Sequence, residues 1–198
     1  MTYVGIDVSK ATFIVAYSSA KSSKTKTFKN TTKGVHEFIQ TLSANEHHCV
    51  LEATGNYSSL LVYLLSRANI TVSLENPLKI KNFARVMLSV TKTDETDARL
   101  IALYGQRMQP APYKLRSDAI LTLKQKRTVI RQLKKQLIAT QNLKGSMEAL
   151  PFFDPKCKKA IEKTIVFLEK QTKGLEEELA ALAQSEYKKQ IDLLTSIK

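Results

Sequence analysis

The segment YVGIDVSKATFIVAY, residues 3–17, contains two short apolar runs separated by the interval Ser9-Lys10-Ala11. The first run, residues 3–8, includes Asp7, and the second, residues 12–17, is rich in aromatic and β-branched residues. Runs of this length and composition are typical of β-strands, and so short an interval favours a hairpin turn. The sequence therefore predicts a β-hairpin that carries an acidic residue near the end of its first strand.

Strands and helices alternate along the next hundred residues or so. Further strands are predicted at residues 25–28, at 49–51 ending at Glu52, and at 70–74. Helices are predicted from Thr31, over 57–68 with Asn56 as N-cap, from Pro77, and over 93–108. The resulting order, β-β-β-α-β-α-β-α-α, indicates a mixed α/β domain over residues 1–112.

The chain after Pro112 shows no strand pattern. Apolar residues fall at helical intervals, and from Ile161 to Leu182 they follow a heptad spacing with one polar interruption, Thr172. A connector with two prolines, residues 150–155, separates two helical stretches, so an antiparallel helical hairpin or coiled coil is expected over residues 113–190. Packing within one chain and an intermolecular coiled coil both stay open. Residues 191–198 are interpreted as the start of a further, missing C-terminal domain.

Composition narrows the class of protein. The 198 residues include 31 Lys and Arg against 18 Asp and Glu, a formal net charge of +13, and 43% are hydrophobic. Such a chain can bury a core, and its basic surplus favours nucleic acid or another polyanion as partner. No apolar run is long enough to span a bilayer, no export signal is visible, and the two cysteines form no disulfide framework. A cytoplasmic protein, associated with the nucleoid when it acts and with no membrane partner, is expected.

Four carboxylates occupy positions typical of a metal site. Asp7 interrupts an apolar strand, Glu52 ends another, and Asp94 and Asp97 share one face at the start of a helix. Oxygen ligands of this kind suit Mg²⁺, and two such ions can activate an attacking oxygen and stabilise a leaving one in phosphoryl transfer. Ordinary roles stay open: Asp94 and Asp97 could serve the helix dipole, and Glu52 could be a surface residue.

Other catalytic chemistries lack their motifs. The sequence has no phosphate-binding glycine loop of the Walker or dinucleotide type and no Gly-x-Ser-x-Gly nucleophile turn. The three histidines, His36, His47 and His48, have no zinc-site spacing with cysteine or carboxylate. Metal-assisted chemistry on the four carboxylates is the best-supported enzymatic interpretation.

Four short motifs together resemble a known family. They are Val4-Gly5-Ile6-Asp7-Val8-Ser9-Lys10, Leu51-Glu52-Ala53-Thr54-Gly55-Asn56-Tyr57, Glu75-Asn76-Pro77 and Lys92-Thr93-Asp94-Glu95-Thr96-Asp97-Ala98. In this order they closely resemble the DEDD transposases of the insertion-sequence one-ten family, relatives of the Piv-type DNA invertases. The resemblance covers about residues 4–100, and the helical remainder is similar only in general character.

The resemblance implies a fold and an activity. The expected fold is RuvC-like, of the RNase H type, with a mixed sheet, flanking helices and a following helical hairpin. The implied activity is DNA transposition or recombination by Mg²⁺-dependent strand cleavage and exchange, with Mn²⁺ as substitute, guided by a structured RNA. It maps the acidic tetrad onto Asp7, Glu52, Asp94 and Asp97. The family also has a C-terminal domain with a serine nucleophile, so the chain is expected to be a fragment or truncation that lacks it.

Lysine and arginine side chains are the candidates for two roles: offsetting the negative charge of the four carboxylates, and contacting nucleic-acid phosphates. Lys10 and Lys92 are the cations nearest the tetrad in sequence, although plain surface roles stay open for both. Eight basic residues and only Asp118 in opposition lie between Lys114 and Lys135. The candidate phosphate contacts are Lys79, Lys81, Arg85, Lys124, Lys126, Arg127, Arg131, Lys134 and Lys135.

Two alternative functions stay open. Actin-like ATPases and sugar kinases also begin with Gly-Ile-Asp and a hairpin, but they place Gly with Thr or Ser after the Asp, where this chain has Val8-Ser9-Lys10. A non-catalytic module that binds nucleic acid or assembles through its hairpin is the other alternative. A homo-oligomer is expected, because recombination joins two DNA partners and the heptad pattern offers a contact.

Overall fold

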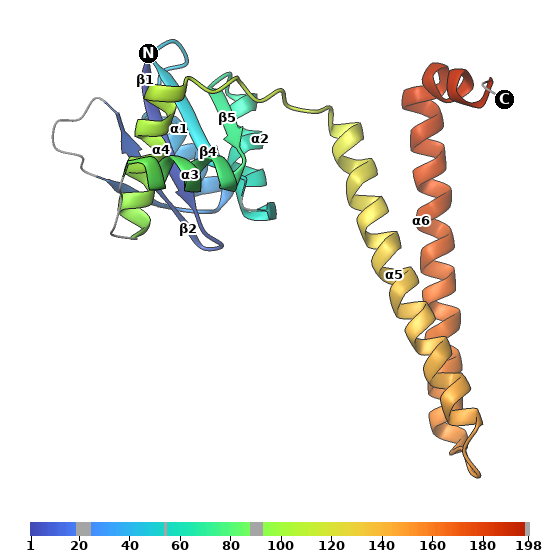
Figure 1. Cartoon of the computed structure of the whole chain (residues 1–198). Coiled ribbons are helices and arrows are strands. Elements are labelled where there is room, and N and C mark those ends of the chain that lie inside the picture. Colours follow the sequence, from blue (N-terminus) through green and yellow to red (C-terminus); the bar gives the residue numbers. More distant parts are fainter. Residues whose placement is uncertain (19–24, 54, 88–92, 197–198) are drawn as a thin grey trace. The chain divides into compact units, whose positions relative to one another are not determined.

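The computed structural model describes residues 1–18, 25–53, 55–87 and 93–196 (Figure 1). The chain divides into two compact units, Met1–Leu115 and Arg116–Lys198.

The first unit is built on a five-stranded mixed sheet. Its strands are β1 (Thr2–Val8), β2 (Thr12–Tyr17), β3 (Lys26–Lys29), β4 (His47–Glu52) and β5 (Thr71–Glu75), in the spatial order β3-β2-β1-β4-β5. β1, β2 and β3 pair antiparallel, whereas β4 pairs parallel to β1 and β5 parallel to β4. The carboxyl ends of β1, β4 and β5 therefore lie at the same end of the sheet.

Helices cover both faces of this sheet (Figure 1). One face packs against α1 (Thr32–Ile39) and α2 (Ser59–Arg67), with Phe13, Phe28 and Phe38 in mutual ring contact at its core. The other face packs against α4 (Asp94–Met108), and α3 (Pro77–Val86) joins it through the cluster that contains Ile80 and Tyr104. The apolar side chains of β1 point to the α1 and α2 face, which leaves Gly5 and Asp7 on the α4 face.

Gly5 explains why α4 comes so close to the sheet. A Cβ atom at this position would overlap the backbone nitrogen of Ala102 and the carbonyl oxygen of Ala98, both in α4. Since only glycine lacks a Cβ, the absence of a side chain at residue 5 lets the helix backbone pack directly on β1. Asp7 lies two residues further along the strand on the same face.

The predicted order of elements is confirmed, with one local error. Each predicted strand and helix of the first unit is present, with ends that differ by one or two residues in most cases. Asn56 is not the N-cap of α2, however. Residues Gly55–Ser58 form a turn of 3-10 helix, and α2 begins after Ser58. Gly55 has a φ of 68°, a left-handed conformation that favours glycine and starts this tight turn.

The second unit is a helical hairpin of α5 (Asp118–Glu148) and α6 (Pro155–Ser196). Two ion pairs join the helices, Lys144–Glu162 at 3.0 Å near the connector and Lys134–Glu176 at 2.6 Å further from it. Earlier residues of α5 thus pair with later residues of α6, so the helices are antiparallel. The seam includes buried Ile130, Leu168 and Thr172. Backbone angles at Tyr187, φ −131° and ψ 25°, interrupt α6 before its last residues. Among the described helices, none is long and apolar enough to cross a membrane.

Candidate catalytic site

Asp7 is a partly buried carboxylate surrounded by other carboxylates. Its pKa is raised from the ordinary value of 3.8 to about 6, chiefly by burial and further by the charges of Asp94, Asp97 and Glu52, while a hydrogen bond from the backbone of Val8 opposes the shift. Since unscreened charge interactions fall off with distance, these three acids lie near Asp7. The structure thus brings together the four acids that the sequence singled out.

Sheet register explains how Glu52 reaches Asp7. Ile6 pairs with Leu51 across the parallel β1–β4 ladder, so Asp7 and Glu52 are the next residues along two neighbouring strands. Neighbouring strands are separated by about 4.8 Å, and residues in register point to the same face. Glu52 therefore lies on the α4 face beside Asp7, as expected for acids at the carboxyl ends of parallel strands.

Asp94 and Asp97 lie in the first turn of α4. Thr93 caps this helix: its hydroxyl accepts a hydrogen bond from the backbone nitrogen of Thr96 at 3.2 Å, and the Thr96 hydroxyl accepts one from the backbone nitrogen of Thr93 at 2.9 Å. This reciprocal cap fixes where the helix starts. Because α4 packs directly on Gly5, its first turn carries both carboxylates to the end of β1.

The chemistry of these four donors fits a hard divalent cation. Carboxylate oxygens are the ligands that Mg²⁺ and Mn²⁺ prefer, and a cation would relieve the mutual repulsion that raises the pKa of Asp7. In the part of the chain that the structure describes, no three His, Cys, Asp or Glu side chains are grouped closely enough to hold one metal ion. The carboxylates are gathered at one end of the sheet but are not closed around a single position.

Glu75 is a further acid at this end of the sheet, and its position beside Glu52 was not predicted from the sequence. Glu75 is the last residue of β5, where it pairs in register with Glu52 of β4, and its side chain is 8% exposed. Its carboxylate forms an ion pair with Lys79 at 2.9 Å and accepts a hydrogen bond from the Tyr104 hydroxyl at 3.3 Å. The available signal was the one that identified Glu52, a carboxylate directly after a short apolar strand.

Asn30 is a second missed residue. Its side-chain amide donates hydrogen bonds to the backbone oxygens of Ser9 and Tyr57, both at 2.9 Å. Ser9 follows Asp7 by two residues, and Tyr57 lies in the turn that follows Glu52. Asn30 thereby ties together the two segments that carry these acids, a tertiary role with no sequence signal.

The candidate cations are divided between the two units. Lys10, Lys79, Lys81 and Arg85 are exposed in the first unit, and Lys79 is paired with Glu75. In the second unit Lys126 pairs with Glu178 and Lys134 with Glu176 across the hairpin. Arg127 and Arg131 are exposed on α5, and so are Lys124 and Lys135. Lys92, predicted to offset the acids, lies outside the described residues.

The first unit is an RNase H-like domain of the type found in DNA transposases. Three features define it: a mixed sheet in the order β3-β2-β1-β4-β5, helices on both faces, and carboxylates at the end of β1. Comparison with known families identifies the chain further. A family model of transposases, that of the DEDD transposases of IS110 elements, matches residues 4–147. The chain therefore belongs to the IS110 DEDD transposase family, as the sequence motifs indicated.

Two curated relatives agree with this assignment. Pilin gene-inverting proteins of Moraxella bovis and Moraxella lacunata are each 33% identical to the chain over 144 residues. Each match covers 68% of this chain and 45% of the relative. The chain thus spans less than half the length of the curated relatives it matches.

Proposed function

We propose that this chain supplies the acidic active site of a DNA recombinase that cleaves and exchanges DNA strands. The observation that carries the proposal is geometric: the register of β1 and β4 places Glu52 beside Asp7, and the packing of α4 on Gly5 brings Asp94 and Asp97 to the same end of the sheet. Membership of a transposase family and similarity to two pilin gene-inverting proteins support the same reaction class.

In this proposal Asp7, Glu52, Asp94 and Asp97 hold Mg²⁺, for which Mn²⁺ can substitute. The bound metal would activate the attacking oxygen and stabilise the leaving oxygen of a phosphodiester. The protein's own contribution is to hold the carboxylates in place. Direct packing of α4 on Gly5 and the Asn30 hydrogen bonds to Ser9 and Tyr57 serve that end.

We further propose that the complete reaction needs a serine nucleophile and a structured guide RNA, as the family resemblance implies. DNA and RNA would both contact the basic surface of the chain. The exposed cations of α5, Arg127 and Arg131 among them, support a role for the hairpin in phosphate binding. Several copies of the chain would assemble to join two DNA partners, and the reaction would take place on chromosomal DNA in the cytoplasm.

Metal binding tests the acidic site without the complete reaction. Titration of the chain with Mg²⁺ at pH 7.5, followed by thermal unfolding, is expected to raise the melting temperature. At about 100 times the dissociation constant, binding adds about 2.7 kcal/mol to the free energy of unfolding. Asp7→Asn and Asp94→Asn are expected to abolish this increase, because each removes a charged ligand.

Glu95 provides a matched control on the same helical turn. Its carboxylate is exposed, contacts Arg99 at 3.8 Å, and is not among the charges that raise the pKa of Asp7. Glu95→Gln is expected to leave the response to Mg²⁺ unchanged. If Asp7→Asn and Asp94→Asn respond to Mg²⁺ as strongly as the unmodified chain, the proposed metal site is wrong.

A further inference from the structure

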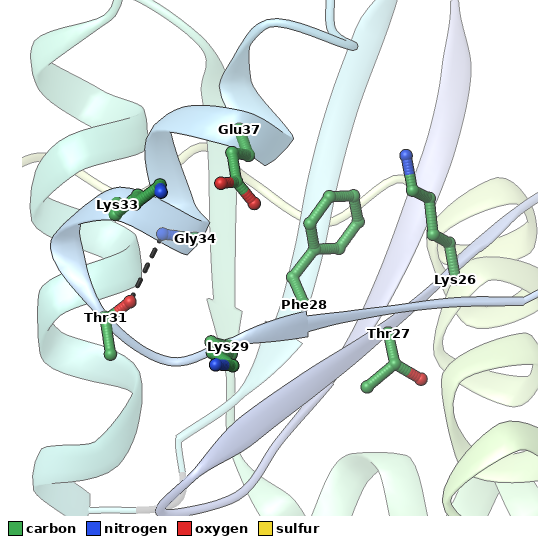
Figure 2. Close-up of a pocket in the computed structure, with 8 residues that line it drawn as sticks. All are labelled: Lys26, Thr27, Phe28, Lys29, Thr31, Lys33, Gly34 and Glu37. Carbon is green, nitrogen blue, oxygen red and sulfur yellow. Dashed lines mark hydrogen bonds between the residues drawn. The ribbon is translucent and has the colours of Figure 1, made fainter.

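An open cavity of about 490 Å³ lies beside β3, the outermost strand of the sheet, and the first turn of α1 (Figure 2). Three lysines line it, Lys26, Lys29 and Lys33, against one carboxylate, Glu37. Neither the sequence motifs nor the carboxylate cluster accounts for this basic cavity.

The lysines of the cavity are placed to bind an anion from solution. Lys29 and Lys33 are exposed, and neither forms an ion pair with another residue that the structure describes. Lys79, Lys126 and Lys134, by contrast, each neutralise a glutamate of this chain. A cation without an internal partner keeps its charge available for an external phosphate.

Lys26 is held in place by an aromatic ring. Its ammonium lies 4.8 Å from the centroid of Phe28, a favourable cation–π distance. Phe28 is itself 7% exposed and packs against Phe13 and Phe38, with ring centroids 5.4 and 5.2 Å away. In Figure 2 the Lys26 side chain extends alongside this ring. The wall of the cavity that carries Lys26 is therefore anchored in the core.

The first turn of α1 adds a fixed positive potential. A Cβ atom at Gly34 would overlap the carbonyl oxygen of Lys29, so glycine lets this turn pack closely against the end of β3. The Thr31 hydroxyl caps the helix by accepting a hydrogen bond from the backbone nitrogen of Gly34 at 3.2 Å (Figure 2). The amino end of a helix attracts negative charge, and here it reinforces the three lysines.

Sheet register relates the cavity to the acids. Asp7 pairs with Ile14 on β2, and Ile14 pairs with Thr27 on β3, so the three residues form one row across the sheet. Two strand spacings separate Asp7 from Thr27, which is about 10 Å. Lys29 is two residues beyond Thr27 and shares its face by strand alternation, whereas Lys26 lies on the face of Phe28, against α1. The cavity thus lies at the edge of the sheet, and Lys29 is its lysine on the side of the acids. One DNA strand rises about 3.4 Å per nucleotide, so a strand that crosses this face from Asp7 to Thr27 spans about three nucleotides.

We propose that the basic cavity of Lys26, Lys29 and Lys33, at the outer edge of the sheet, binds backbone phosphates of the DNA that reaches the carboxylate cluster. This inference rests on the proposed function, because it assumes that DNA reaches the acids. The cavity would set the path of the strand across β2 and β3 without reading its sequence, as phosphate contacts do.

The test compares two double variants of equal charge. Lys29→Gln with Lys33→Gln removes two cations of the cavity, and Lys163→Gln with Lys170→Gln removes two exposed cations of α6. The affinity of the whole chain for a fluorescent DNA duplex is measured over a series of salt concentrations. Each lysine–phosphate contact that is lost should lower the slope of log affinity against log salt by about 1. The cavity variant is therefore expected to lose about 2 from the slope and the α6 variant nothing.

The outcomes separate this inference from the proposed function. An unchanged slope in the cavity variant, or an equal loss in the α6 variant, would overturn the cavity site while Mg²⁺ binding still tests the acids. A loss seen only with an RNA hairpin in place of the duplex would overturn the assignment to DNA. If the unmodified chain binds no DNA, the cavity site is overturned, and Mg²⁺ binding still tests the acidic site. Equal melting temperatures of the three proteins would show that folding is intact.

Discussion

Replacing Asp7 with asparagine is expected to stabilise the metal-free protein near neutral pH. Burial and the charges of Asp94, Asp97 and Glu52 raise the pKa of Asp7 from 3.8 to about 6. The folded state therefore binds a proton that the unfolded state has already lost between these two pH values. By linkage, the free energy of unfolding falls as pH rises through this window and is constant above it.

The size of the effect follows from the pKa. A pKa about two above its ordinary value corresponds to about 3 kcal/mol for a fully shielded group. Asp7 is partly exposed, so solvent screening reduces the expected cost to about 1–2 kcal/mol. Asparagine carries no charge at any of these pH values. Asp7→Asn should therefore be more stable than the unmodified chain by about 1–2 kcal/mol at pH 7 and about equally stable at pH 4.

Urea unfolding in the presence of EDTA, at a series of pH values from 4 to 8, measures this difference directly. Glu95→Gln is the control, since Glu95 lies on the same helical turn but does not act on Asp7. Its difference from the unmodified chain should not depend on pH in this window. If Asp7→Asn has the same pH dependence as the unmodified chain, the carboxylates do not converge on Asp7 and the reasoning is wrong.

Three further predictions concern packing and binding. Gly5→Ala should lower the free energy of unfolding by about 3 kcal/mol or more, because the added methyl overlaps the α4 backbone; an undiminished unfolding midpoint in urea would contradict the direct packing. Thr172→Val should stabilise the hairpin by about 1 kcal/mol, since among the described residues the buried Thr172 hydroxyl has no hydrogen-bond partner. The exposed control Thr164→Val should not, and equal melting temperatures for the two would refute this account. Arg127→Gln with Arg131→Gln should weaken binding of a structured RNA and lower its salt slope by about 2, which filter binding would measure; unchanged slopes would exclude these side chains as phosphate contacts.

The sequence predicted the fold because its local and long-range patterns agree. Apolar runs of strand length, a Pro after Asn76 and a Thr93 cap each specify an element that tertiary packing then uses. Asp7 could be recognised because a charged residue inside an apolar strand has few structural explanations. Asp94 and Asp97 could be placed at a helix start and grouped with Asp7 and Glu52 as candidate metal ligands, and the family resemblance then mapped all four onto an acidic tetrad.

Other features depended on contacts that no local pattern encodes. Asn30 gains its role from two backbone oxygens that the fold brings to it, Ser9 and Tyr57. Asn56 was wrongly predicted to cap α2. It lies inside a 3-10 turn, Gly55–Ser58, that precedes the α-helix, and short 3-10 turns are common at the start of α-helices. The basic cavity was missed since Lys26, Lys29 and Lys33 come from a strand and a helix, and become neighbours only where α1 packs on β3.

Anomalous diffraction from crystals of the chain soaked in Mn²⁺ tests the central claim most directly. An anomalous peak is expected among the carboxylates of Asp7, Glu52, Asp94 and Asp97, and it should be lost in crystals of Asp7→Asn. Glu95→Gln crystals should retain the peak. Manganese bound only at other positions, with the four carboxylates unoccupied at saturating concentration, would contradict the claim that they form a metal site.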